Sequence, residues 1–335
     1  MATFQDCTIG FGTESTYGTG VTPTRWLEFL DESLDYNKNI IQGEGLRGGS
    51  RVLRSGRRIV SSSDGGGDFS VEVASKGMGL FLSYCLGVGT STLVSGTTYQ
   101  QNFTLTDQIN LPTFTLQKGL PRVDGTIDPY TFTGCAVASW ELTFGNDAIL
   151  QMSTTIDARD VTTATGYAAV SYAAGANVFA FKDASIFTGT FTAPTTTVLA
   201  SAATPLASVR SGSLSVDNHL TNDRYNFGSA GKKGRQPVGM REITGSLEVE
   251  YADATFRDAI LNDTEMTLVL TYTGAALSAG TETFQVAIPS LRFSGNLPSA
   301  NGGDLITHPL EFRVFDNAVA AQPLWVSMRT SDSAL

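Results

Sequence analysis

The sequence predicts an all-β protein built from two tandem β units, each with one short flanking helix. Apolar and polar residues alternate with a period of two along most of the 335 residues, which is typical of strands with one buried face. Gly and Thr are frequent, and charged residues make up only 16%, below the roughly 25% of an average soluble protein. The same succession of segments also occurs twice. A folded chain with so little surface charge is expected to cover much of its surface by assembling.

Single segments support these elements in turn. Residues 69–73 and 247–251 each place apolar side chains on one face and polar ones on the other, and they are too short and too rich in strand formers for helices. Residues 76–86 and 253–262 suit helices, and Asp253 favours a helix N-cap. Each helix is expected directly after a strand of the same type.

Five segments of the first half resemble five of the second half in the same order, which predicts a duplication. The pairs are residues 27–34 with 179–186, 67–73 with 245–251, 113–116 with 267–270, 139–146 with 290–296, and 149–158 with 306–315. Each match alone is weak, but their shared order is not. We expect a first β domain over residues 1–165, a second over residues 166–320, and a C-terminal extension over residues 321–335.

Two stretches rich in Ala, Thr and Ser predict connections. Residues 161–176 have the composition of a linker between the domains, and residues 188–207 are expected to form an exposed loop or hairpin. The C-terminal extension carries Trp325. A Trp on a terminal arm commonly docks onto another surface, so we expect Trp325 to contact either a neighbouring subunit or its own domain.

Nearly half of the 22 basic residues lie in two Gly-rich stretches at matching positions of a chain whose net charge is −10. They are Arg47, Arg51, Arg54, Arg57 and Arg58 in the first stretch, and Arg224, Lys232, Lys233, Arg235 and Arg241 in the second. Each stretch is expected to be a long, mobile, cationic loop that contacts the acidic surface of another copy. A solvated loop and a contact with nucleic acid are the alternatives, although aromatic residues for base stacking are nearly absent.

No segment predicts catalytic or cofactor chemistry. Residues 43–48 fit the pattern G-x-G-x-x-G, but without the flanking strand and helix of a dinucleotide site. Residues 64–68, DGGGD, lack the further oxygen ligands of a cation site and are expected to form a turn. Neither His219 nor His308 has a Cys or carboxylate at metal-ligand spacing. We predict no enzyme, no metal and no cofactor, while a Cys-His or carboxylate pair brought together by folding stays open.

Cysteine usage and hydropathy indicate a protein that is made and used in water. Cys7, Cys85 and Cys135 form no spaced framework, so free thiols in a reducing cytoplasm are expected. No secretory signal is visible, and no apolar run approaches the ~20 residues needed to span a bilayer. The acidic balance argues against uniform binding to nucleic acid.

Residues 10–20, GFGTESTYGTG, and the strand at residues 29–34 resemble the opening of the tail tube proteins of long-tailed bacteriophages. The likeness continues through both halves in the Gly-rich basic loop, the strand G-x-F/L-x-V and the short helix after it. It covers most of the chain through loose motifs. The doubled unit departs from the single-domain members of that family.

The resemblance implies a β-sandwich whose strands join those of neighbouring subunits in a closed barrel around a lumen. It implies a structural virion protein that polymerises into stacked rings, forming the tail tube through which DNA passes into the host. Ring closure leaves no exposed sheet edge, and an acidic wall does not grip DNA. Because single-unit tubes form six-fold rings, three doubled chains are expected to form a ring with pseudo-six-fold symmetry, with a hexamer as the alternative.

The partners implied by the resemblance are further copies of the chain and the tail tip and tail terminator proteins. The tape-measure protein and phage DNA would pass through the lumen without specific binding, and no membrane contact is expected. The protein is then expected in the virion tail, after assembly in the host cytoplasm. The alternatives are another β-type phage structural protein, from a baseplate or capsid decoration, and a carbohydrate-binding adhesin.

Overall fold

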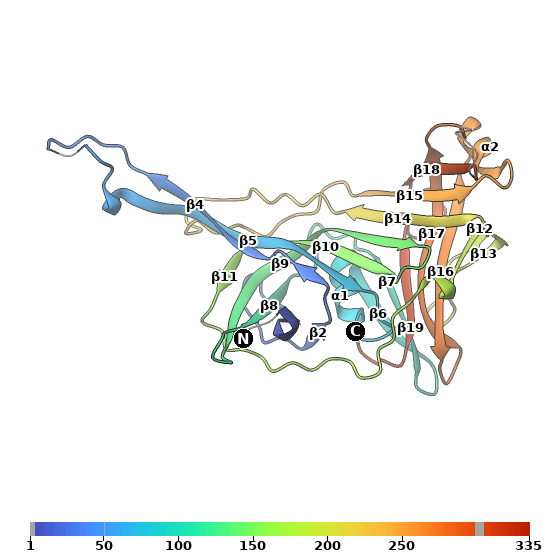
Figure 1. The fold of residues 1–335 in the computed structure, drawn as a ribbon, viewed down its shortest axis with the longest axis horizontal. Helices are drawn as coiled ribbons and strands as arrows, with labels where there is room; N and C mark the ends of the chain where they lie inside the picture. The colour runs from blue at the N-terminus through green and yellow to red at the C-terminus, as the bar shows by residue number, and fades with distance from the viewer. Residues whose placement is uncertain (1–3, 50, 299–304) are drawn as a thin grey trace.

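Antiparallel strands make up almost all of the regular structure in the computed structural model, which describes residues 4–49, 51–298 and 305–335 (Figure 1). This confirms the predicted all-β class. The strands are β1 (Thr8–Thr13), β2 (Arg25–Leu27), β3 (Asp31–Glu32), β4 (Asp35–Gln42), β5 (Arg58–Glu72), β6 (Gly87–Ser95), β7 (Thr98–Leu105), β8 (Phe114–Pro121), β9 (Ile127–Gly145), β10 (Gln151–Ala158), β11 (Asp160–Thr162), β12 (Ala184–Thr192), β13 (Ser201–Pro205), β14 (Val209–Asp217), β15 (Glu242–Glu250), β16 (Met266–Ala276), β17 (Thr281–Ser294), β18 (Thr307–Val314) and β19 (Trp325–Thr330). The helices are α1 (Gly79–Leu86) and α2 (Thr255–Leu261), with short 3-10 turns at Phe4–Asp6, Ser55–Arg57 and Phe181–Asp183.

Two series of seven strands have the same order. The first is β2-β1-β8-β9-β10-β5-β4, and the second is β13-β12-β16-β17-β18-β15-β14, with every neighbouring pair antiparallel. A helix follows the equivalent strands β5 and β15. Even a β-bulge recurs, between Phe114 and Leu116 on β8 and between Met266 and Leu268 on β16. The topology of one half is therefore repeated in the other.

The strand register shows which matches in the sequence are true equivalents. Residues 245–251 take the place of residues 67–73, because Glu72 lies opposite β10 where Glu250 lies opposite β18. The match of residues 27–34 with 179–186 is wrong, since β3 and β4 pair with β5 whereas β12 pairs with β16. Residues 31–37 correspond instead to residues 211–217. Short alternating segments resemble one another locally, and only the pairing partner separates them.

The glycine run at residues 64–68 lies inside β5, so the predicted turn is wrong. Gly66 and Gly67 have φ angles of 150° and 144°. A Cβ atom on either would lie 2.4 Å from a backbone oxygen, that of Ile156 or of Ser33. Glycine alone allows this backbone conformation together with so close an approach of the neighbouring chain on each side. The run therefore lets β5 continue as one 15-residue strand.

Both predicted helices form. α1 lies within residues 76–86 and α2 within residues 253–262. Asp253 lies just before α2, where its Oδ1 accepts a hydrogen bond from the Thr255 N–H at 2.8 Å and satisfies a donor of the first turn. The linker residues 161–176 carry no strand beyond the end of β11, and the β12–β13 hairpin covers most of residues 188–207.

Continuous sheet joins the two halves. β14 pairs with β15 on one side and with residues 139–145 of β9 on the other. At the other end, β19 pairs with both β17 and β7. One apolar core runs through both halves and includes the fully buried Phe11, Trp140 and Phe284. The halves are thus held together by strand pairing as well as by a shared core.

Candidate assembly surfaces

Strands β4 and β5 extend away from the rest of the chain as a long hairpin, which we call the arm and define as residues 38–63 (Figure 1). Strand pairing ends where Gln42 lies opposite Arg58, and residues 43–57 form the tip. Figure 1 shows this tip far from the other elements. The G-x-G-x-x-G pattern lies in the tip, where no βα unit surrounds it. The predicted basic loop is therefore the end of a structured hairpin.

The arm exposes both charge and apolar surface. None of its arginines forms an ion pair with a residue that the structure describes; they are Arg47, Arg51, Arg54, Arg57 and Arg58. Its apolar side chains are also exposed; they are Ile40, Ile41, Leu46, Val52, Leu53, Ile59 and Val60. Exposed apolar side chains gathered on one projecting element, with charge around them, are typical of an interaction surface. This apolar component of the arm was not predicted from the sequence.

The second basic stretch forms the equivalent hairpin, residues 218–241 between β14 and β15, which we call the inner hairpin. Lys232 pairs with Asp160, and Lys233 pairs with Asp157 and lies 3.1 Å from Asp64. Lys233 is only 4% exposed. The prediction of a mobile cationic loop is wrong for this stretch, because carboxylates of the first half form ion pairs with two of its cations within the chain.

The remaining cations of the inner hairpin also have partners. The Arg235 guanidinium donates to the Leu111 carbonyl at 2.7 Å, and Arg241 donates to the Thr106 carbonyl at 2.8 Å. Arg224 donates to the Arg235 carbonyl across the hairpin. Burial lowers the pKa of Arg241. These bonds fix the inner hairpin against the loop between β7 and β8.

The carboxylates below Lys233 respond differently to burial. Burial raises the pKa of Asp157, and the hydrogen bonds and charge of Lys233, with a bond from Gln236, offset this only in part. Burial also acts to raise the pKa of Asp64, but hydrogen bonds from Tyr225 and Lys233 together outweigh it, and the pKa is lowered. The Tyr225 hydroxyl donates to Asp64 at 2.7 Å. The pKa values of the two carboxylates around Lys233 are therefore shifted in opposite directions.

The strand pair of β14 with β9, which we call the seam, shows how two units of this kind meet. Leu214 lies opposite Leu142 and Val216 opposite Trp140 along the β14–β9 pair, and all four side chains are buried. β3 and β4 hold the place of β14 in the first half, and β5 is the only strand paired with them in the described parts of the chain. Their outer edge is therefore open.

Carboxylates of the open edge satisfy part of its backbone. The Leu34 N–H donates to Glu32 at 2.9 Å, and the Tyr36 N–H donates to Asp35 at 2.7 Å. Acidic side chains on an edge strand also discourage uncontrolled pairing. The repeated dipeptide Ser33-Leu34 and Ser213-Leu214 was the sequence signal that could have revealed this edge.

The C-terminal extension packs on its own chain. Trp325 is 6% exposed and lies in a small cluster with Val269 and Ala287, and its ring centroid is 5.8 Å from that of Phe191. Its strand, β19, lies between β17 and β7. Trp325 therefore contacts its own chain, which is one of the two contacts that the sequence predicted.

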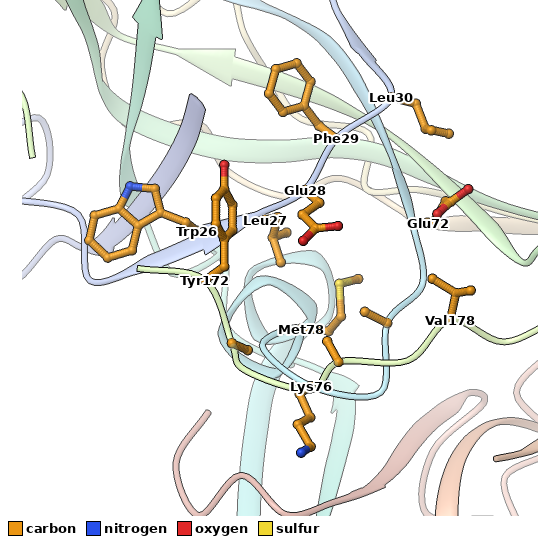
Figure 2. A pocket seen from close by; sticks show the side chains of 13 residues that line it. Trp26, Leu27, Glu28, Phe29, Leu30, Glu72, Lys76, Met78, Tyr172 and Val178 are labelled. Atoms are coloured by element: carbon orange, nitrogen blue, oxygen red, sulfur yellow. The ribbon is translucent and has the colours of Figure 1, made fainter. Parts of the chain in front are cut away.

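A small pocket of about 180 Å³ lies where the linker, residues 161–176, crosses the first half (Figure 2). Trp26, Glu28 and Met78 line it together with Tyr172 from that segment. Figure 2 shows the Lys76 amine pointing away from the Glu28 and Glu72 carboxylates. The described residues contain no cluster of three or more metal-ligating side chains. The pocket is smaller than the roughly 300–1,000 Å³ of ordinary ligand sites.

Sheet edges, a projecting hairpin and a continuous two-part sheet define a structural protein that assembles through its strands. The family model described as phage tail tube protein matches residues 5–314, and the chain belongs to this family. A comparison with curated proteins found no match. None of the helices in the described ranges is long and apolar enough to cross a membrane. The chain is thus a structural protein of the virion tail, where it polymerises into the stacked tube that conducts DNA into the host.

Proposed function

We propose that one chain supplies two tube domains, residues 1–165 and 166–320, and that three chains close a ring with pseudo-six-fold symmetry. The observation that carries this proposal is the identical order of seven strands in the two halves. Among the contacts between the two halves is one antiparallel strand pair, β14 with β9. Repetition of that contact between chains gives a closed, heterologous ring.

The two basic hairpins take different parts in this ring. Arg47, Arg51, Arg54, Arg57 and Arg58 contact other copies, because they lack ion-pair partners among the described residues of their own chain and sit among exposed apolar side chains. Arg224, Lys232, Lys233, Arg235 and Arg241 hold the second domain against the first, at a junction that a single-domain tube would make between subunits. Trp325 fastens the residues 321–335 extension to the second domain.

The tube acts mechanically and carries out no reaction. Tail tip and terminator proteins cap its ends, and the tape-measure protein and DNA pass through the lumen without specific binding. The net charge of −10 supports passage without adhesion, because like charge keeps the duplex from the wall.

Electron microscopy of the purified, concentrated protein tests both the tube and the number of chains in each ring. Stacked rings or tubes with three chains per ring are expected. Six full chains per ring would contradict the ring stoichiometry and leave the tube intact. A protein that forms neither rings nor tubes, with or without a pre-formed tail tip, would contradict the tube itself.

A further inference from the structure

Two of the contacts between the two halves have counterparts that the described residues leave open. In the first, the outer edge of β14 pairs with β9, and in the second, the inner hairpin lies on the first half. The open counterparts in the first half are the outer edge of β3 and β4 and the arm. An unpaired sheet edge next to an amphipathic hairpin is a template for pairing with another chain.

The second half holds the counterpart of the β9 edge that receives β14. Cys135 and Leu291 occupy the same position beside the repeated bulge, because Phe114 pairs with Cys135 and Met266 with Leu291. β9 carries a further bulge between Val137 and Ser139 that β17 lacks, so residues 139–142 of β9 correspond to residues 294–297. Ser294 ends β17, and the next three residues lie outside any strand and include Leu297, which is 52% exposed. Among the described residues no strand pairs with the outer side of this segment, so a receiving edge is present.

We propose that residues 35–37 of one copy pair antiparallel with residues 294–296 of the next copy, and that the arm lies across the second half of that copy. This inference rests on the proposed tube, and it gives the register of the contact. Ser215 lies opposite Glu141 in the seam, which places Asp35 opposite Asn296. Asp217 lies opposite Ser139, which places Asn37 opposite Ser294.

Charges on the two surfaces agree with this placement. Counted back along the chain from the equivalent paired residues Val60 and Val238, Arg54 of the arm is at the position of Lys232 in the inner hairpin. Asp316 follows β18 as Asp160 follows β10, and it is exposed. The ion pair between Lys232 and Asp160 therefore predicts an ion pair between Arg54 and the next copy's Asp316.

At a second pair of corresponding positions, both residues differ from those of the inner hairpin and its partner surface. Lys233 corresponds to Ser55 in the arm, and its partner Asp157 corresponds to Arg313. The arm has no cation at this position, and the second half has no carboxylate at the corresponding position. No like charges therefore meet there. Phe315 and Val319, on either side of Asp316 in the sequence, are 42% and 89% exposed. They offer apolar surface to the exposed leucine and valine residues of the arm.

A disulfide test measures the register directly. In a Cys7→Ser background, the variant Asp35→Cys with Asn296→Cys should give covalent multimers on oxidation of assembled tubes, ending at three chains, because paired residues place their Cα atoms within disulfide reach. Ser215→Cys with Glu141→Cys is the matched control, since the same positions within one chain should link without raising the mass. Either single cysteine should give no multimers.

The outcomes separate the two levels of the proposal. Tubes that form from the double variant without covalent multimers, while the control pair oxidises, would overturn the register and leave the tube. Failure of the unmodified protein to form any tube would overturn the tube itself.

A charge exchange tests the same contact without engineered thiols. Arg54→Asp and Asp316→Arg should each slow tube growth by at least about tenfold, as expected for the loss of a close interfacial charge pair. The combined variant should recover most of the unmodified rate in light scattering. A combined variant as slow as the two single ones would overturn the ion pair, even where each single variant folds normally.

Discussion

The arm and the inner hairpin are the same element in two environments. Both extend the strand pair that precedes the flanking helix, and the arm carries six basic residues and the inner hairpin five. The inner hairpin lies on acidic residues of the first half, and Lys233 is almost completely buried there. The arginines of the arm have no ion-pair partner among the described residues, and its apolar side chains are exposed.

The difference shows that charge pattern does not decide what a basic segment does. In one hairpin the cations contribute to the stability of the monomer, whereas in the other they are free for a partner. The contact that the inner hairpin makes inside the chain is therefore a guide to the contact that the arm makes between chains. Substitutions that separate folding from assembly test this comparison.

The largest effect is expected at the buried end of the inner hairpin. Lys233→Ala leaves Asp157 and Asp64 without their cation, and loss of one partner of a buried ion pair costs about 3–5 kcal/mol of unfolding free energy. Arg51→Ala in the arm is the matched control and should change stability by less than about 0.5 kcal/mol. Urea unfolding at neutral pH measures both.

The same variant has a pH dependence of defined sign. Burial already raises the pKa of Asp157, and removal of Lys233 raises it further. The folded state then binds a proton that the unfolded state does not, so stability is gained as the pH falls toward that raised pKa. The deficit of Lys233→Ala should therefore be smaller at pH 5 than at pH 7. An equal deficit at both values would contradict the assigned role of Asp157.

An intermediate effect is expected for Asp64→Asn. This change weakens the hydrogen bonds from Tyr225 and Lys233, and bonds to a charged group contribute about 1.5–3 kcal/mol. Because the folded pKa of Asp64 is lowered, its contribution is complete above the ordinary Asp pKa of about 4 and disappears as the pH falls through the folded value. Unfolding curves of the variant and the unmodified protein should converge in acid. A difference that does not shrink as the pH falls below the ordinary Asp pKa would contradict the assignment.

The smallest effect on stability is expected from shortening the arm. Replacement of residues 43–57 by Asn-Gly, which favours a two-residue hairpin turn, should change the unfolding free energy by less than about 1 kcal/mol, because loop length is a weak determinant of stability. Tube formation should be lost. Thermal unfolding and electron microscopy of one preparation give both results. Normal tubes from this variant would show that the tip is dispensable.

Several features of the fold were accessible from the sequence because they are local. Alternation with a period of two marks a strand such as residues 247–251 without knowledge of its partner. The helices after β5 and β15 follow from composition and from Asp253. The likeness to tail tube proteins was also visible, and the family match confirms it.

Features that depend on pairing were not accessible. The DGGGD run reads as a turn, yet it lies within β5 because two neighbouring strands approach its backbone. The counterpart of residues 31–37 is residues 211–217, and the register reveals this through a shared neighbour.

The sequence by itself determined the all-β class of the protein and the concentration of positive charge in two stretches. Both depend on residue type and spacing along the chain, which act over a few residues. Only the tertiary structure decided that Lys233 is buried against Asp157 while Arg54 has no ion pair among the described residues. Burial and ion pairing depend on segments more than 70 residues away, and alternation or composition carries no information about which distant carboxylate lies beneath a given cation.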